Sequence, residues 1–411
     1  MPGLTWTRGN VYSVNSTTPS RLTGSMISTT RPQTLVNSTG FYETVTPPTY
    51  AEYDVSQVID VKDVAAHPVA GDGVTDDTAS LQAILNSAAG KQLLYFPHGI
   101  YLLTDTLLIP VGSRLVGESF TEFSASGSKF KNAKQPTPML KIGNAGDVGV
   151  AQLTDFIFTV ADILPGAVLV EVNMAGGKPG NQSRDLHCCT NLCPLDIYFL
   201  VILGNSWAWV ADHDLDGSST QTPSPGGGFL VEAQRGTWLL GLGIEHHTLY
   251  QMNIVGAKNV FLGLQQGEAA YWQGAGATVL APAPWTDSLL PSEPPDWSWC
   301  AATDAVCRMG LYQRVSNSSI INISSGGFWN FVSGPSRTFC ATDCQDNAAL
   351  YESSSKVFTY GISTINSKTL ILESGVGGDK DVAEVVRTAN SGAAHDGFPT
   401  GIMAAYLRMS G

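Results

Sequence analysis

The sequence predicts an all-β chain, and within that class it favours a parallel β-helix. Charged residues make up 14% of the chain and glycine occurs 43 times, a composition typical of many short strands joined by tight turns. From residue 91 onward no second long helical pattern follows, which excludes an alternating βαβ architecture and leaves a sandwich, a barrel or a β-solenoid. A short internal repeat then favours the solenoid.

The repeat lies in residues 239–273. "LLGL" at 239–242 returns as "FLGL" at 261–264, and "YQ" at 250–251 returns as "WQ" at 272–273, both after 22 residues. A period of this size corresponds to about one coil of a parallel β-helix.

Three regions are expected along the chain. Residues 1–58 are rich in Thr, Ser and Pro and predict an extended lead-in arm. Residues 59–385 predict the β-helix domain, with strands in runs such as "LTDFIFTV" and "AVLVEV", and residues 386–411 predict a C-terminal tail.

A short amphipathic helix is expected after the "GDG" turn at 71–73. Thr75, Asp76 or Asp77 can cap its first turn. Its apolar face is predicted from the helical spacing of Leu81, Ile84 and Leu85.

Net charge and hydropathy exclude several partners. The net charge of −13 argues against a nucleic acid, which needs a basic surface, and favours a neutral substrate. No apolar run is long enough for a membrane span, and residues 1–20 lack the pattern of a signal peptide.

Cysteines and sequons nevertheless favour an extracellular protein. Cys300 with Cys307, and Cys340 with Cys344, are close pairs suited to disulfides; zinc is the rival interpretation, but neither spacing is C-x-x-C. Five sequons point the same way, so Met1 is not expected to be the native start. They lie at Asn15, Asn37, Asn181, Asn317 and Asn322. The remaining cysteines, whose pairing stays open, are Cys188, Cys189 and Cys193.

Two sets of motifs resemble known families. "GDGVTDDTASLQAIL" and "LLYFPHGIYLLTDTLLIPVGSRLVGES" resemble the opening of the pectate-lyase-like right-handed β-helix. "WAWVADHDLDG", "GLGIEHHTLYQ", "NVFLGLQQGEAAYWQ" and "FCATDCQ" resemble glycoside hydrolase family 55, fungal exo-β-1,3-glucanases. The resemblance implies a single-stranded right-handed parallel β-helix with a short N-terminal capping helix, secretion, and laminarin-type glucan as substrate.

The resemblance also shows departures. The family places two β-helices side by side with the cleft between them, and residues 10–385 resemble only the second, so a first β-helix domain is a missing partner. Residues 175–206 replace a strand-forming link of the family.

Glu268 is the predicted general acid, because glycosidic cleavage needs a protonated carboxyl group beside the leaving oxygen. "QGEAAY" at 266–271 resembles the family motif that carries this acid. Glu245 lies 23 residues earlier. With 22 residues in each coil, the two glutamates should lie on neighbouring coils, displaced by one residue along the strand. That offset predicts a carboxyl separation within roughly 6.5–9.5 Å, as in inverting pairs. The resemblance assigns Glu245 to positioning the water.

A glucose site is expected around the acid. By resemblance it comprises Trp209, Asp212, Asp214, Gln266, Tyr271 and Trp272. The alternative for the aspartates is an ordinary Asp-rich turn. His246 and His247 lack the spacing of a zinc site and are expected to be structural or sugar-contacting, and the chemistry requires no metal or organic cofactor.

Three functions remain in competition. The leading hypothesis is an exo-acting, inverting β-1,3-glucan hydrolase that releases glucose. The second is a non-catalytic or truncated glucan-binding β-helix. A polysaccharide lyase ranks last, because Lys258 is the only Lys or Arg in the stretch from 238 to 275.

Overall fold

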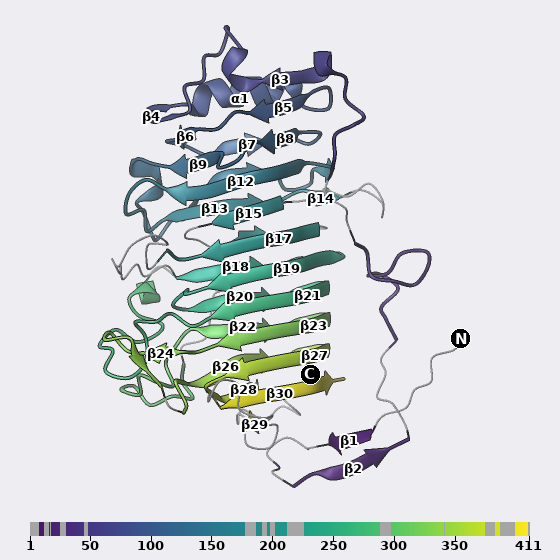
Figure 1. Ribbon diagram of the computed structural model, residues 1–411, viewed down its shortest axis with the longest axis vertical. Helices are drawn as coiled ribbons and strands as arrows, with labels where there is room; N and C mark the ends of the chain where they lie inside the picture. The colour runs from purple at the N-terminus through teal and green to yellow at the C-terminus, as the bar shows by residue number, and fades with distance from the viewer. Residues whose placement is uncertain are drawn as a thin grey trace.

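The computed structural model describes thirteen segments of the chain, and those from residue 48 onward build one parallel β-helix (Figure 1). This confirms the predicted fold class. The described residues are 8–11, 16, 18–24, 30–44, 48–176, 186–190, 195–197, 202–211, 226–287, 297–340, 342–374, 383–386 and 399–409.

Two long sheets form the walls of the β-helix. The first consists of β7 (Leu107–Ile109), β10 (Thr137–Ile142), β13 (Ala167–Val172), β16 (Leu195–Ile197), β18 (Gly227–Val231), β20 (Tyr250–Val255), β22 (Leu311–Ser316), β26 (Gln345–Glu352), β28 (Ser367–Ser374) and β29 (Ala383–Val386). The second consists of β3 (Val58–Asp60), β5 (Leu93–Phe96), β8 (Arg114–Gly117), β12 (Gln152–Val160), β15 (Leu186–Thr190), β17 (Ile202–Trp209), β19 (Thr237–Glu245), β21 (Lys258–Glu268), β23 (Ser319–Trp329), β27 (Ser355–Ile365) and β30 (Thr400–Arg408), with β4 (Asp72–Asp76), β6 (Ile100–Leu103) and β9 (Glu122–Ala125) beside it.

Shorter elements lie outside the two walls. The two-stranded pairs are β1 (Arg8–Val11) with β2 (Ser20–Thr23), β11 (Val148–Gly149) with β14 (Ala175–Gly176), and β24 (Val332–Ser333) with β25 (Thr338–Phe339). The 3-10 turns are η1 (Val55–Gln57), η2 (Val61–Asp63), η3 (Ser128–Phe130) and η4 (Trp285–Asp287). No helix in the described segments is long and apolar enough to cross a membrane.

Helix α1 (Thr78–Ala88) covers the N-terminal end of the stack (Figure 1). Asp77 takes the N-cap position as expected, yet its carboxylate accepts the backbone N–H groups of Ala70 and Gly71, while Asp76 accepts the N–H of Thr78. The predicted apolar face is confirmed by the buried residues Leu81, Ile84 and Leu85, which join the main core.

The C-terminal end closes differently. Strand β30 pairs antiparallel with β27, and β29 pairs antiparallel with β28, whereas the earlier strands of both walls run parallel. The predicted tail from residue 386 thus contains the last strand of one wall, and the proposed domain limits remain a prediction.

The strand register corrects the predicted repeat. Leu239 pairs with Leu262 and Trp238 with Phe261, so the two coils are 23 residues apart, one more than the expected 22. Leucines at both 239 and 240 allow the shifted match, but backbone hydrogen bonds align the aromatic residues. Tyr250 pairs with Leu311, so the "YQ" and "WQ" match has no counterpart in the structure.

A column of left-handed residues bends the second wall at one level. In β12, β17, β19, β21, β23 and β27 the residue at this level has a positive φ, and the ladder skips that position. These residues are Asp155, Asn205, Gly241, Leu264, Ser325 and Gly361. A single left-handed residue turns a strand sharply, so each coil makes its corner at the same height.

The lead-in arm packs against this wall. Trp238 donates its indole N–H to the carbonyl of Leu35 (2.9 Å), and the Tyr42 ring stacks on Phe261 with centroids 3.8 Å apart. These contacts hold residues 30–44 across the coils that contain β19 and β21.

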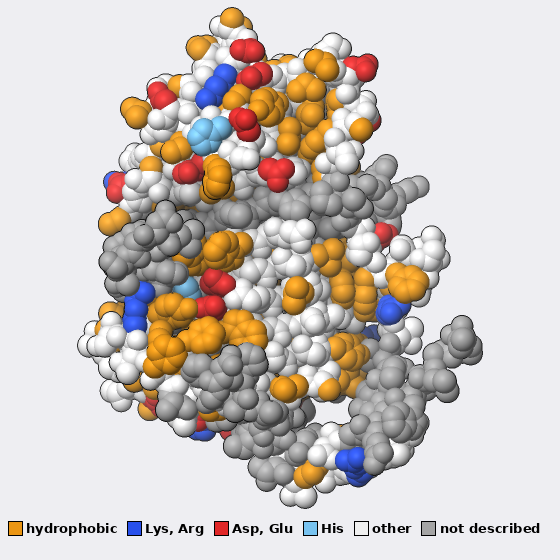
Figure 2. Space-filling view, viewed as in Figure 1, with side chains coloured by type: hydrophobic (Ala, Val, Ile, Leu, Met, Phe, Trp, Pro, Cys, Tyr) orange, Lys and Arg blue, Asp and Glu red, His pale blue; other side chains and the backbone are white. Residues whose placement is uncertain are grey.

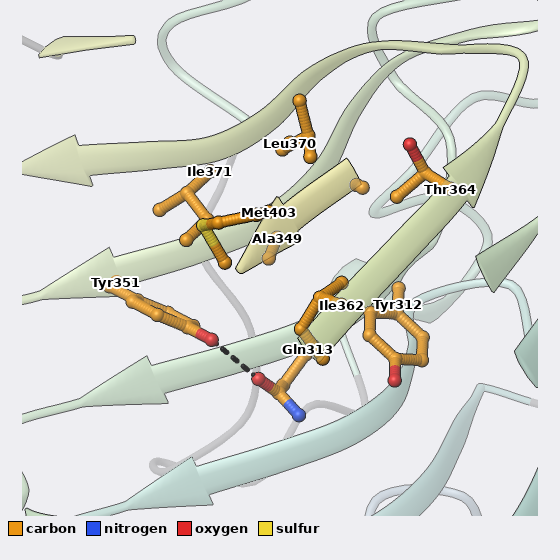
Figure 3. Close-up of a pocket in the computed structure, with 10 residues that line it drawn as sticks. Tyr312, Gln313, Ala349, Tyr351, Ile362, Thr364, Leu370, Ile371 and Met403 are labelled. Atoms are coloured by element: carbon orange, nitrogen blue, oxygen red, sulfur yellow. Dashed lines mark hydrogen bonds between the residues drawn. The ribbon is translucent and has the colours of Figure 1, made fainter. Parts of the chain in front are cut away.

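A small interior cavity lies near the C-terminal end (Figure 3). Tyr351 donates to the Oε1 atom of Gln313 (2.7 Å), and Gln313 donates to Gln265 (2.9 Å), so polar groups inside this part of the β-helix satisfy one another. The cavity is lined by Tyr312, Gln313, Ala348, Ala349, Tyr351, Ile362, Thr364, Leu370, Ile371 and Met403.

The corner column generates a stability prediction. Gly241→Ala should lower the free energy of unfolding by about 1–2 kcal/mol, because φ at Gly241 is +66° and an added Cβ would lie 2.9 Å from Oδ1 of Asn205. Gly204→Ala is the matched control: its φ is ordinary and the nearest atom lies 3.9 Å away. Denaturant midpoints of both variants measure the difference, and equal midpoints would contradict the corner's role.

Candidate active site

The two predicted glutamates end neighbouring strands and lie side by side. Glu245 closes β19, Glu268 closes β21, and the two are direct register partners. The predicted displacement by one residue is therefore wrong, because the true coil offset equals their separation in sequence. Their Cα atoms lie about one coil spacing apart, roughly 4.8 Å, so the displacement that supported a 6.5–9.5 Å gap is absent.

Glu268 has polar neighbours on two sides. The Tyr271 hydroxyl donates to its Oε2 atom, and Nε2 of His246 lies 3.4 Å from the same oxygen. The rings of His246 and Tyr271 are 4.3 Å apart, so the two residues form one wall beside the carboxylate. His246 has a φ of +69°, a conformation that costs energy for this residue type and is common at functional sites.

Glu245 lies in a more enclosed position. Trp207 donates its indole N–H to the Oε2 atom of Glu245 over 3.1 Å. Burial, reinforced by the negative charge of Glu268, raises the pKa of Glu245, and hydrogen bonds from Gln266 and Trp207 oppose this only in part. Glu245 therefore tends to retain its proton to a higher pH than an exposed glutamate does.

Aromatic residues surround the pair. Trp209 is the register partner of Glu245 on the preceding coil, and its ring stacks on Trp207 with centroids 5.0 Å apart. Figure 2 shows acidic side chains and a histidine together at mid-height of the visible face, with hydrophobic side chains above and below. Trp272 is only 7% exposed and packs against Val210 and Ala270, behind this surface.

The other predicted substrate residues divide into two groups. Gln266 and Tyr271 lie beside the glutamates. Gln266 hydrogen-bonds to Glu245, and the Tyr271 hydroxyl donates to Glu268. Asp212 and Asp214 lie outside the described residues.

Sequence reasoning missed two residues near the site. Trp329 is the register partner of Glu268 on the following coil, 61 positions later in the chain. Arg337, on the turn between β24 and β25, has its guanidinium 6.0 Å from the centre of the Tyr271 ring. The tryptophan in "GGFW" at 326–329 was visible in the sequence. Its pairing with Glu268 was not, because a long connection before β22 separates the two residues in the chain.

His247 is fully buried and separate from the glutamates. Its Nδ1 atom lies 3.1 Å from Oε1 of Gln251, and burial lowers its pKa to about 3, which keeps the ring neutral. This environment is that of a structural histidine.

Both predicted disulfides form. Cys300 bonds to Cys307 and Cys340 bonds to Cys344. Cys193 lies outside the described residues, and only the backbone of Cys188 and Cys189, in β15, is described.

One group of possible metal ligands occurs in the described part of the chain: Asp304, Cys307 and Asp346. The Cys307 sulfur is already bonded to Cys300, so it offers no thiolate.

A matching family model agrees with the fold. A family model described as rhamnogalacturonase A/epimerase, pectate lyase-like, matches residues 58–152. The solved structure of sacteLam55A from Streptomyces sp. SirexAA-E is similar with a TM-score of 0.48 and 13% identity, over 93% of this chain and 62% of that one.

Several curated relatives are named as fungal glucosidases. A glucan endo-1,3-beta-glucosidase, BGN13.1 of Trichoderma harzianum, is 36% identical over 77% of this chain and 46% of its own length. A glucan 1,3-beta-glucosidase of Cochliobolus carbonum is 31% identical over 90% of this chain and 50% of its own length. The chain thus spans about half the length of these relatives, and the similarity confirms the predicted resemblance to glycoside hydrolase family 55.

The raised pKa of Glu245 generates a pH prediction. The folded chain holds this proton to higher pH than the unfolded chain, so ionising Glu245 costs stability as the pH rises from the ordinary value of 4.5 through the raised one. Glutamine has no such ionisation and can still accept the Trp207 hydrogen bond. We therefore expect Glu245→Gln to gain stability over the parent as the pH rises through the range above 4.5.

Denaturant titrations across this range measure the gain, with Glu52→Gln, an exposed glutamate, as control. A stability difference that stays constant with pH would contradict the environment described for Glu245.

Proposed function

We propose that this chain is a β-1,3-glucan hydrolase module that acts from a chain end, inverts the anomeric configuration and releases glucose. The observation that carries the proposal is the pair of adjacent glutamates, Glu245 and Glu268, on one face among tryptophan and tyrosine side chains. Similarity to glucan 1,3-beta-glucosidases supports the substrate class.

Glu268 is the proposed general acid. Cleavage of the glycosidic bond needs a protonated carboxyl group beside the leaving oxygen. In the proposed reaction Glu268 gives this proton to the glycosidic oxygen as the bond to the anomeric carbon breaks. The Tyr271 hydroxyl then stabilises the carboxylate that remains.

Glu245 is proposed to position the attacking water. An inverting reaction places that water on the face of the sugar opposite to the acid. Because Glu245 and Glu268 are neighbours rather than opposed groups, further polar residues are needed around the water. We propose that they belong to the part of the relatives' length that this chain does not span.

The remaining contacts orient the sugar. Trp209, Gln266 and Tyr271 are proposed to bind the terminal glucose, with Trp272 supporting the wall from behind and Asp212 and Asp214 contributing hydroxyl contacts. No metal or organic cofactor enters this scheme.

Secretion and glycosylation are also proposed. Two disulfides and fungal glucan-degrading relatives support an extracellular location. Among the described sequons, Asn317 is exposed, whereas Asn322 is 1% exposed and accepts a hydrogen bond from Tyr42.

Glucose release from laminarin tests the catalytic proposal. The parent chain should release glucose, and Glu268→Gln, which keeps the shape but cannot donate a proton, should lose about 10²–10⁴-fold in kcat. Glu52→Gln is the control for the same chemical change on an exposed residue. A folded parent that binds laminarin without releasing glucose would instead support the glucan-binding fragment.

The stereochemistry has its own test. Inversion at a β-linked glucose should give α-glucose as the first product, observed by proton NMR before mutarotation. β-Glucose as the first product would exclude inversion and would make Glu245 a nucleophile candidate, because adjacent carboxylates suit the shorter separation of retaining enzymes.

A further inference from the structure

Two rows of side chains cross the coils at the candidate active site. The first row is Trp209, Glu245, Glu268 and Trp329, which are register partners on β17, β19, β21 and β23. Residues in register on parallel strands point to the same face. The two glutamates therefore have a tryptophan on each side, and the row extends over three coil spacings, roughly 14 Å.

The second row lies two residues earlier on the same strands. It consists of Trp207, Gly243, Gln266 and Gly327. At its two glycines an indole ring takes the space that a side chain would fill. A Cβ on Gly243 would lie 2.8 Å from Cδ1 of Trp207, and one on Gly327 would lie 2.6 Å from Cζ2 of Trp329.

The Trp207 ring therefore packs closely against Gly243, and the Trp329 ring packs closely against Gly327. Trp207 directs its N–H edge at the Glu245 carboxylate (3.1 Å). Trp329 is partly exposed, and its ring is held in place by the close fit to Gly327. A partly exposed indole can stack against the apolar face of a sugar ring. The hydroxyl groups of that sugar then point sideways to polar neighbours.

We infer that Trp329 forms a second sugar-stacking subsite, on the opposite side of the carboxylate pair from Trp209. The inference rests on the proposed function, and it adds a direction: the glucan chain lies along the axis of the β-helix, across successive coils. If the terminal glucose occupies the Trp209 side, Trp329 binds the sugar of the leaving group. The scissile bond then lies over Glu268.

Two substrates separate this subsite from the catalytic centre. β-1,3-Glucotriose fills both sides of the carboxylate pair, whereas β-glucosyl fluoride has a leaving group of one atom and fills one side. Trp329→Ala should lower kcat/KM for the trisaccharide roughly three- to tenfold more than for the fluoride, the range expected for one aromatic contact. Trp329→Phe should recover part of the loss.

Controls keep structural damage apart from loss of the subsite. Phe120→Ala removes an exposed ring, 75% accessible, near the N-terminal end and should leave the ratio of the two substrates unchanged. Trp329→Ala should also keep its thermal unfolding midpoint near that of the parent. Equal losses on both substrates, or no loss on either, would overturn the inference.

A parent without turnover would refute the proposed function but still allow this test. Calorimetric titration of Glu268→Gln, with and without Trp329→Ala, compares the affinities for glucotriose and glucose. A loss of affinity for the trisaccharide alone supports the subsite, and unchanged trisaccharide affinity refutes it.

Discussion

Backbone hydrogen bonding between successive coils determines where every side chain of the candidate site lies. Trp209, Glu245, Glu268 and Trp329 are separated by 36, 23 and 61 positions in the chain, yet they are partners in one row. The unequal spacings are absorbed by connections outside the walls, since each buried N–H and C=O group of a strand must pair with the next coil. Loop length is free to vary, whereas strand register is not.

The same constraint explains how the ends of the β-helix are finished. A parallel stack exposes unpaired backbone groups and apolar interior at both ends. At the N-terminal end α1 lays Leu81, Ile84 and Leu85 over the core. At the C-terminal end β30 reverses direction, and Arg408 lies 3.6 Å from Glu373 within the buried interior. Antiparallel pairing and a paired charge make a poor template for a further coil.

The sequence predicted the features that depend on local patterns. The α1 helix follows from the spacing of a few apolar residues, and the two disulfides follow from close cysteine pairs. Register was missed by one residue, because apolar matches such as "LLGL" and "FLGL" fit at two offsets and backbone pairing decides between them.

The missed features depend on long-range pairing. Leu264 and Ser325 adopt left-handed conformations at the corner, although neither residue type signals one. Their conformation follows from their place in a column whose other members include Gly241 and Gly361. Trp329 was missed for a related reason, since 61 positions in the chain separate it from its register partner Glu268.

Adjacent register also limits the chemistry that two glutamates can perform. The coil spacing of about 4.8 Å holds the backbones of Glu245 and Glu268 together, and no choice of neighbouring side chain can widen it. Burial, and after it the negative charge of the nearby Glu268, raises the pKa of Glu245. Adjacent register brings the two carboxyl groups together. It does not place two groups on opposite faces of a sugar ring. Attack by water from the opposite face of the sugar therefore requires polar groups outside these two strands. In the proposed reaction the β-helix by itself supplies the general acid.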